Sequence, residues 1–109
     1  MKYELFFTDS AKRDLNRALD YIEFVLKNKE ASNHLLDFVE KNMSLLASNP
    51  KLHPIVNDPV LSSWHIRTFS IKNYIVFYTI IDKTIYIIRF LSSRRDWESI
   101  LKQWLLSNN

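Results

Sequence analysis

The amino-acid sequence predicts an α+β domain with the element order β-α-α-β-β-β-α, in which a helical hairpin and a C-terminal helix pack on a four-stranded, mainly antiparallel sheet. Two observations carry this prediction. Between residues 64 and 91, three runs rich in β-branched and aromatic residues are separated by two short polar breaks, the pattern of a three-stranded meander. Upstream, apolar residues recur at spacings of three and four, which indicates amphipathic helices.

The first elements follow from apolar spacing and capping residues. Residues 3–7 form an apolar run that predicts an edge strand. Thr8 or Asp9 is expected to cap the helix that follows, because a side-chain oxygen there satisfies free backbone N–H groups. This helix is predicted from Asp9 to about Asn28, and the apolar residues of its buried stripe are Leu15, Leu19, Ile22 and Leu26.

The second helix is predicted from about Ala31 to Ser48 and ends before Pro50, since the residue before a proline avoids helical geometry. The two helices form the expected hairpin, which covers one face of the meander. Residues 50–63 contain all three prolines and predict a loop, and residues 95–106 return to helical spacing.

The meander is expected to be the core of the fold. Its middle run, residues 74–81, is apolar at nearly every position, which is typical of a strand covered on both faces. Asn73 is expected to take the left-handed backbone conformation of the first turn, and Asp82 is expected to form the second.

Length and composition exclude several classes of protein. The 109 residues fit one domain, 1–109, and the apolar content of 47% is that of a globular chain. The absence of cysteine excludes disulfides and thiol chemistry, and the absence of glycine argues against a phosphate-cradling P-loop. A signal peptide and a membrane span are not predicted, so a cytoplasmic protein without membrane contact is expected.

Positive charge is concentrated in the sheet half of the chain. Residues 1–50 carry 7 Lys and Arg against 8 Asp and Glu, whereas residues 51–109 carry 8 against 4. This distribution favours an acidic or phosphate-bearing partner at the sheet, and an ordinary solvated face is the alternative.

Four arginines are the candidate functional residues. Arg67 and Arg89 each stand alone within an apolar strand, and Arg94 and Arg95 follow the last strand. Together they could form a concave cationic site that binds phosphate or a target, because guanidinium groups bind phosphate through paired hydrogen bonds. Strand alternation would place Arg89 on the face that carries Ile85, Ile87 and Leu91.

The alternative for Arg67 and Arg89 is an ion pair with a helix carboxylate, since a charge in an apolar strand must pair or meet water; the candidates are Asp14, Asp96 and Glu98. Tyrosines of the meander could stack on bases or protonate a leaving group, although strand tyrosines are more often core residues; these are Tyr74, Tyr78 and Tyr86.

The C-terminal helix offers candidate partner contacts or, alternatively, anchors on the sheet: Trp97, Leu101 and Trp104. No metal site or other cofactor is expected, because the three histidines lack ligand-like spacing. A groove for a partner peptide is a further alternative for the exposed faces.

Three segments carry a resemblance to a known family: residues 6–15 (FFTDSAKRDL), residues 66–78 (IRTFSIKNYIVFY) and residues 85–97 (IYIIRFLSSRRDW). With them the chain resembles the RelE/ParE superfamily of toxins from bacterial type II toxin–antitoxin systems, of the ParE-like plasmid stabilisation kind. The likeness covers nearly the whole chain, and its expected fold agrees with the elements predicted above.

The resemblance implies growth arrest and a cognate antitoxin that binds and neutralises the toxin in a hetero-oligomer. One branch of the superfamily poisons DNA gyrase, and the other cuts mRNA in the ribosome without metal, using the RNA's own 2′-hydroxyl. Nuclease members often carry an arginine after the first tyrosine of the middle strand, where this chain has Ile75, and many carry His-Gly where it has Ser92-Ser93.

These departures favour the gyrase-directed branch, because a serine of ordinary pKa is a poor proton shuttle. A ribosome-dependent endoribonuclease, with Tyr86 or the arginines in the catalytic roles, is the alternative. A degenerate toxin that only binds its partner is the third reading.

Overall fold

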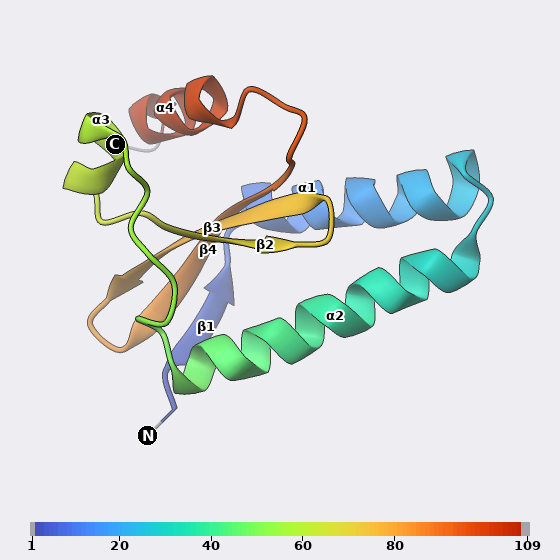
Figure 1. Cartoon of the computed structure of the whole chain (residues 1–109), viewed down its shortest axis with the longest axis horizontal. Helices are drawn as coiled ribbons and strands as arrows, with labels where there is room; N and C mark the ends of the chain where they lie inside the picture. Colours follow the sequence, from blue (N-terminus) through green and yellow to red (C-terminus); the bar gives the residue numbers. More distant parts are fainter. Residues whose placement is uncertain (1, 108–109) are drawn as a thin grey trace.

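The computed structural model describes residues 2–107 and shows a central sheet with helices on both of its faces (Figure 1). The sheet has the strand order β1-β4-β3-β2. β2, β3 and β4 form the predicted antiparallel meander, and β1 lies at the edge, parallel to β4. The strands are β1 (Glu4–Phe7), β2 (Arg67–Ile71), β3 (Tyr74–Ile81) and β4 (Thr84–Ser92). The predicted fold class is confirmed.

The helical hairpin begins with α1 (Asp9–Asp20), and its second arm is α2 (Lys29–Ser48). The Thr8 hydroxyl caps α1 by accepting a hydrogen bond from the backbone of Ala11 at 3.2 Å, as expected. α2 begins two residues earlier than predicted, because the Asn28 side chain accepts from the Ala31 N–H and caps the helix. The break between the helices therefore lies at residues 26–28, and of the predicted break at residues 28–30 only Asn28 is outside a helix.

A π-helical turn, η1 (Tyr21–Val25), joins α1 to the tip of the hairpin. Its wider winding is visible in the hydrogen bond from the Leu26 N–H to the Tyr21 carbonyl. The extra residue per turn rotates the end of the helix, so Val25 and Leu26 are 64% and 56% exposed. The prediction that Leu26 continues the buried stripe is therefore wrong.

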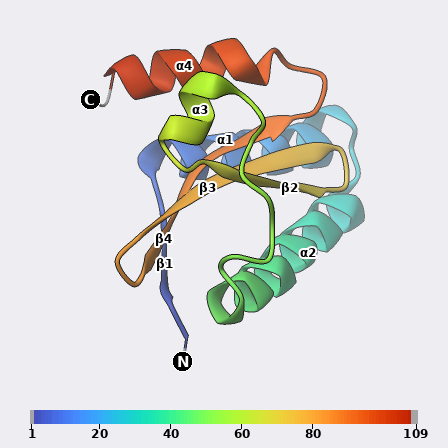
Figure 2. The same ribbon diagram turned by 60° about the vertical axis from the view of Figure 1, so that its left-hand side comes forward.

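Two hydrophobic clusters lie on opposite faces of the sheet. The first packs the hairpin against one face and includes Leu35, Val39, Val76 and Tyr78. The second packs α3 (Pro59–Ser63) and α4 (Trp97–Ser107) against the other face, as Figure 2 shows. β3 contributes to both clusters, which explains its apolar sequence.

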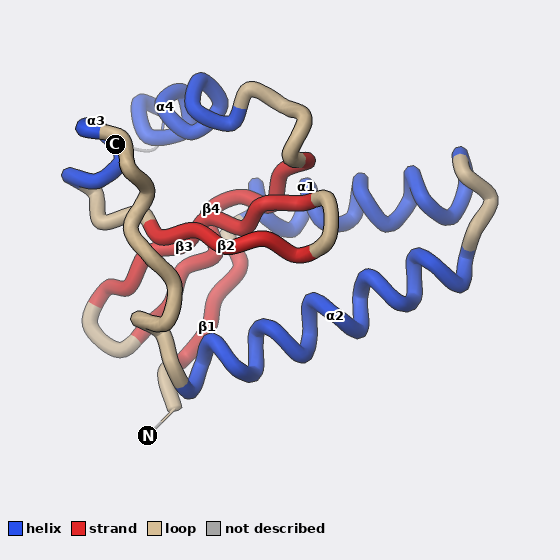
Figure 3. Tube along the Cα trace, in the orientation of Figure 1, coloured by secondary structure: helices blue, strands red, loops and turns tan. Residues whose placement is uncertain are grey.

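The segment between α2 and β2 was predicted to be a loop throughout, but it contains α3 (Figure 3). Asp58 starts this single turn by accepting hydrogen bonds from the backbone N–H groups of Val60 and Leu61. Pro59 occupies the first helical position, where its missing N–H costs nothing. The buried side chain of Leu61 packs this turn against α4.

Two backbone details of the meander differ from the prediction. In the β2–β3 turn the left-handed conformation is taken by Lys72, with φ 53°, and not by Asn73. At the bulge in β4, Phe77 is opposite Arg89 and Tyr78 is opposite Ile87, so Ile88 is an extra residue. Side chains on the two sides of the bulge therefore change face, and Arg89 does not share a face with Ile85 and Ile87.

Candidate functional site

Asp14 of α1 binds the part of β4 that β1 leaves unpaired. β1 pairs with β4 only as far as Ile87, and beyond that point the Asp14 carboxylate accepts the Phe90 N–H at 3.1 Å. The same carboxylate binds Arg89 through two guanidinium N–H groups, Nε to Oδ2 at 2.6 Å and Nη2 to Oδ1 at 2.9 Å. The side chain of Asp14 is 4% exposed and that of Arg89 is 15% exposed. Arg89 thus forms the ion pair that was the alternative to a phosphate site.

Arg67 lies at the opposite edge of the sheet. Its guanidinium Nη1 donates to the backbone carbonyl of His53 at 2.6 Å. Arg67 is opposite Tyr78, which belongs to the hairpin-side cluster, whereas Arg89 is opposite Phe77, which belongs to the α4-side cluster. Because opposed residues of an antiparallel pair share a face, Arg67 and Arg89 lie on opposite faces, and the predicted cluster of four arginines is not assembled.

His53 packs against the sheet beside Arg67. Its ring stacks on Phe69 with ring centroids 4.2 Å apart, and burial lowers the pKa of His53 from its ordinary value of 6.5. His53 therefore binds a proton more readily in the unfolded chain than in the folded chain. Its contribution to the free energy of unfolding is fully present above about pH 6.5 and is lost as the pH drops below that value.

We expect the urea midpoint to be lower at about pH 5 than at about pH 7.5, and the difference to shrink in His53→Phe, which keeps the stacking and cannot titrate. An equal acid shift in the variant and the native chain would contradict this role of His53.

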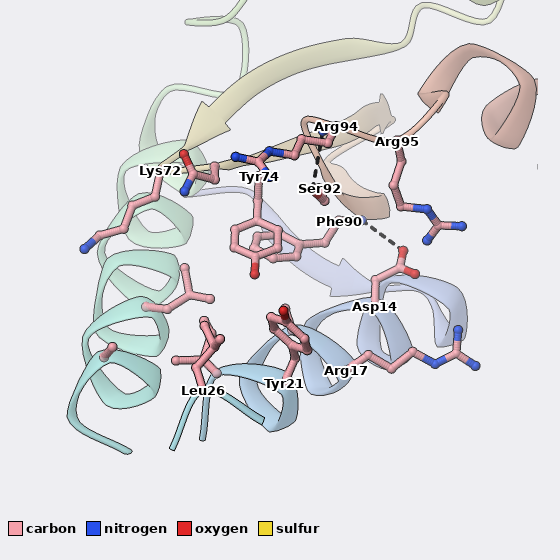
Figure 4. Close-up of a pocket in the computed structure, with 15 residues that line it drawn as sticks. Asp14, Arg17, Tyr21, Leu26, Lys72, Tyr74, Phe90, Ser92, Arg94 and Arg95 are labelled. Carbon is pink, nitrogen blue, oxygen red and sulfur yellow. Dashed lines mark hydrogen bonds between the residues drawn. The ribbon is translucent and has the colours of Figure 1, made fainter. Parts of the chain in front are cut away.

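Arg94 and Arg95 both line an open cleft of about 830 Å³ between the hairpin tip and the end of the sheet, and their side chains point in different directions (Figure 4). We call this the basic cleft. Two further cations line it, Arg17 from α1 and Lys72 from the β2–β3 turn. One carboxylate lines it, that of Asp14, which already binds Arg89. The cleft is therefore positively charged.

Sequence reasoning missed Arg17 and Lys72 as members of this site. Arg17 is exposed on a helix whose pattern indicates only amphipathicity, and Lys72 is a turn residue. Both reach the cleft through tertiary packing, Arg17 from α1 and Lys72 from the β2–β3 turn. The excess of positive charge in the second half of the chain was the available sequence signal. It indicated a basic sheet, but it did not include Arg17, which belongs to α1.

The tyrosines separate into different environments. Tyr74 stacks on Phe90 at the floor of the cleft with centroids 4.9 Å apart, and Figure 4 shows its hydroxyl pointing toward that of Tyr21. Burial, and secondarily the charge of Tyr21, raises the pKa of Tyr74, so it remains a neutral hydrogen-bond donor. Tyr78 is fully buried and donates to the Pro50 carbonyl. Tyr86 lies outside the cleft, edge-on to Phe6.

The aromatic and apolar residues of α4 pack within the chain. Leu101 is 1% exposed, Trp97 lies 5.4 Å from Phe77 between ring centroids, and Trp104 Nε1 donates to the Ser10 hydroxyl. They anchor α4 on the sheet, which is the alternative that the sequence analysis gives to partner contact. A role for these residues in partner binding stays a prediction.

Within residues 2–107, no three His, Asp or Glu side chains are grouped as metal ligands would be. In the same part of the chain, no helix has both the length and the apolar character that crossing a membrane requires.

Comparison with known proteins gives one family and a related structure. The model of the family described as "ParE toxin of type II toxin-antitoxin system, parDE" matches residues 5–97. A solved structure described as "Chromosomal ParDE TA system from P. aeruginosa" is 19% identical, with a TM-score of 0.67, and the match covers 84% of this chain and 96% of that chain. At this identity the likeness shows a shared fold. No curated protein sequence matches the chain.

Proposed function

The chain belongs to the ParE toxin family of type II toxin–antitoxin systems, and on this basis we propose that it arrests growth by acting on DNA gyrase and is neutralised by a cognate antitoxin. The family match includes the sheet, the hairpin and the basic cleft, and it ends at Trp97, the first residue of α4. Both partners are proposed to meet the toxin in the cytoplasm.

The observation that carries the choice of gyrase over mRNA is the chemistry at the end of β4. Where the resemblance implies an acid or base in nuclease members, this chain has Ser92 and Ser93, and the Ser92 hydroxyl oxygen accepts the Arg94 N–H at 3.4 Å. Neutral hydroxyls do not move protons efficiently near pH 7. Arg89, a candidate for charge stabilisation, is held by Asp14. A toxin that binds its target without cutting RNA needs neither group.

The proposal predicts that DNA synthesis fails before translation when the protein is induced. Labelled thymidine and labelled methionine are added to parallel cultures, and the same gene with an early stop codon is the control. We expect thymidine incorporation to fall first, because gyrase inhibition stalls replication forks directly. In a supercoiling assay, the purified protein is expected to inhibit gyrase.

An earlier fall in methionine incorporation would overturn the gyrase proposal and favour the ribosome-dependent endoribonuclease, whose mRNA cuts could then be mapped. If neither label falls while folded protein accumulates, the proposed growth arrest is wrong and the chain acts only by binding its partner.

A further inference from the structure

Three exposed arginines lie along α1 and in the loop that follows β4. Arg13 and Arg17 are four residues apart in α1, so their side chains share one face of the helix. Arg17 and Arg95 both line the basic cleft, and Figure 4 shows their side chains on the same side of the view, with Asp14 between them. We call Arg13, Arg17 and Arg95 the arginine patch.

The charge of the arginine patch is not neutralised by the chain itself. Across residues 2–107, its three arginines form no ion pair with a carboxylate. The neighbouring carboxylate, that of Asp14, has both of its oxygens bound to Arg89. Because like charges close together repel, an anionic ligand that spans the patch relieves their repulsion.

The exposed side of α1 carries only polar and charged residues, which are Asp9, Lys12, Arg13, Asn16, Arg17 and Asp20. A protein partner is bound mainly through a core of apolar and aromatic side chains, and this side of the helix offers none. Single-stranded nucleic acids are bound by aromatic side chains on which bases stack, and these are missing there as well. Guanidinium groups on a polar helix surface are suited to the phosphates of a duplex.

We propose that the arginine patch binds the phosphate backbone of duplex DNA, and that this duplex is the DNA on which gyrase acts. The second part rests on the proposed function, whereas the affinity of the patch for a duplex does not. Each guanidinium group binds a phosphate through paired N–H groups. Such contacts position a protein on DNA without reading its sequence.

The test measures binding of a fluorescent DNA duplex by anisotropy at several salt concentrations. Each phosphate contact contributes about −0.9 to the slope of log K against log salt concentration. Arg13→Gln/Arg17→Gln should therefore make the slope shallower by about 2 and weaken binding at low salt at least about tenfold. Glutamine has nearly the helix propensity of arginine, so α1 is preserved, and circular dichroism checks the fold.

The matched control is Lys41→Gln/Lys51→Gln, which removes the same charge from exposed positions outside the patch. Its slope should equal that of the native chain. Equal changes in the two variants, no change in either, or tighter binding of single-stranded DNA, RNA or polyglutamate than of the duplex would overturn the inference.

A supercoiling assay with gyrase tests the second part of the proposal. We expect Arg13→Gln/Arg17→Gln to require at least about tenfold more protein than the native chain for equal inhibition, in line with its weaker duplex binding. Inhibition that is equally strong in this variant and in the native chain defeats the inference alone. Duplex binding through the patch by a native chain that does not inhibit gyrase defeats the proposed function and leaves the patch as a DNA-binding site.

Discussion

Replacing Asp14 with alanine is expected to lower the free energy of unfolding by about 3–5 kcal/mol, because it leaves the Arg89 charge buried without a partner. The substitution removes two hydrogen bonds from the guanidinium group and the one that satisfies the Phe90 N–H. Urea denaturation followed by tryptophan fluorescence measures the change, and the slope of the transition shows whether the native state remains compact.

Two further variants identify the cause of this loss. Asp37→Ala removes an exposed carboxylate from α2 and should change stability by no more than about 0.5 kcal/mol. Asp14→Leu/Arg89→Met removes both charges and should recover much of the lost stability, because apolar residues often replace a buried pair at little cost. A double variant as unstable as Asp14→Ala would show that the Phe90 hydrogen bond, and not the unpaired arginine, dominates.

The Asp14–Arg89 pair was only partly predictable from the sequence. An arginine alone in an apolar strand required a partner or water, and Asp14 was one of three candidate carboxylates. The choice among them depended on β1 being too short to cover β4, which leaves room for α1 at that edge. The bulge at Ile88 carries no clear sequence signal, because an extra β-branched residue in an apolar strand looks like the strand itself.

The sheet, the hairpin and the C-terminal helix were predictable because each depends on local periodicity. The basic cleft was only partly predictable, since Arg17, Lys72 and the Arg94-Arg95 pair are far apart in sequence and meet through tertiary packing. The exposed tip depended on the π-helical turn at Tyr21–Val25, whereas the sequence pattern there continues an ordinary helix. Sites assembled from distant exposed residues therefore need the fold before they can be recognised.

The attachment of α4 gives the second large expected effect. Leu101→Ala should lower the free energy of unfolding by about 2–5 kcal/mol, the range for removing a fully buried leucine side chain. Leu101 is 1% exposed and belongs to the cluster that joins α4 to Phe77, Ile88 and Leu91. Urea denaturation measures the loss, and hydrogen exchange of the α4 amides shows whether the helix detaches locally or the whole domain unfolds.

Leu106→Ala is the matched control, because it makes the same chemical change in the same helix at a residue that is 80% exposed. It should shift stability by no more than about 0.5 kcal/mol. Equal effects of the two substitutions would contradict the packing of α4 on the sheet. If Leu101→Ala releases α4 while the sheet and hairpin stay folded, growth arrest by that variant tests α4 itself, since the rest of the toxin is intact. Loss of arrest would then assign target binding to α4, and unchanged arrest would assign it to the sheet and hairpin.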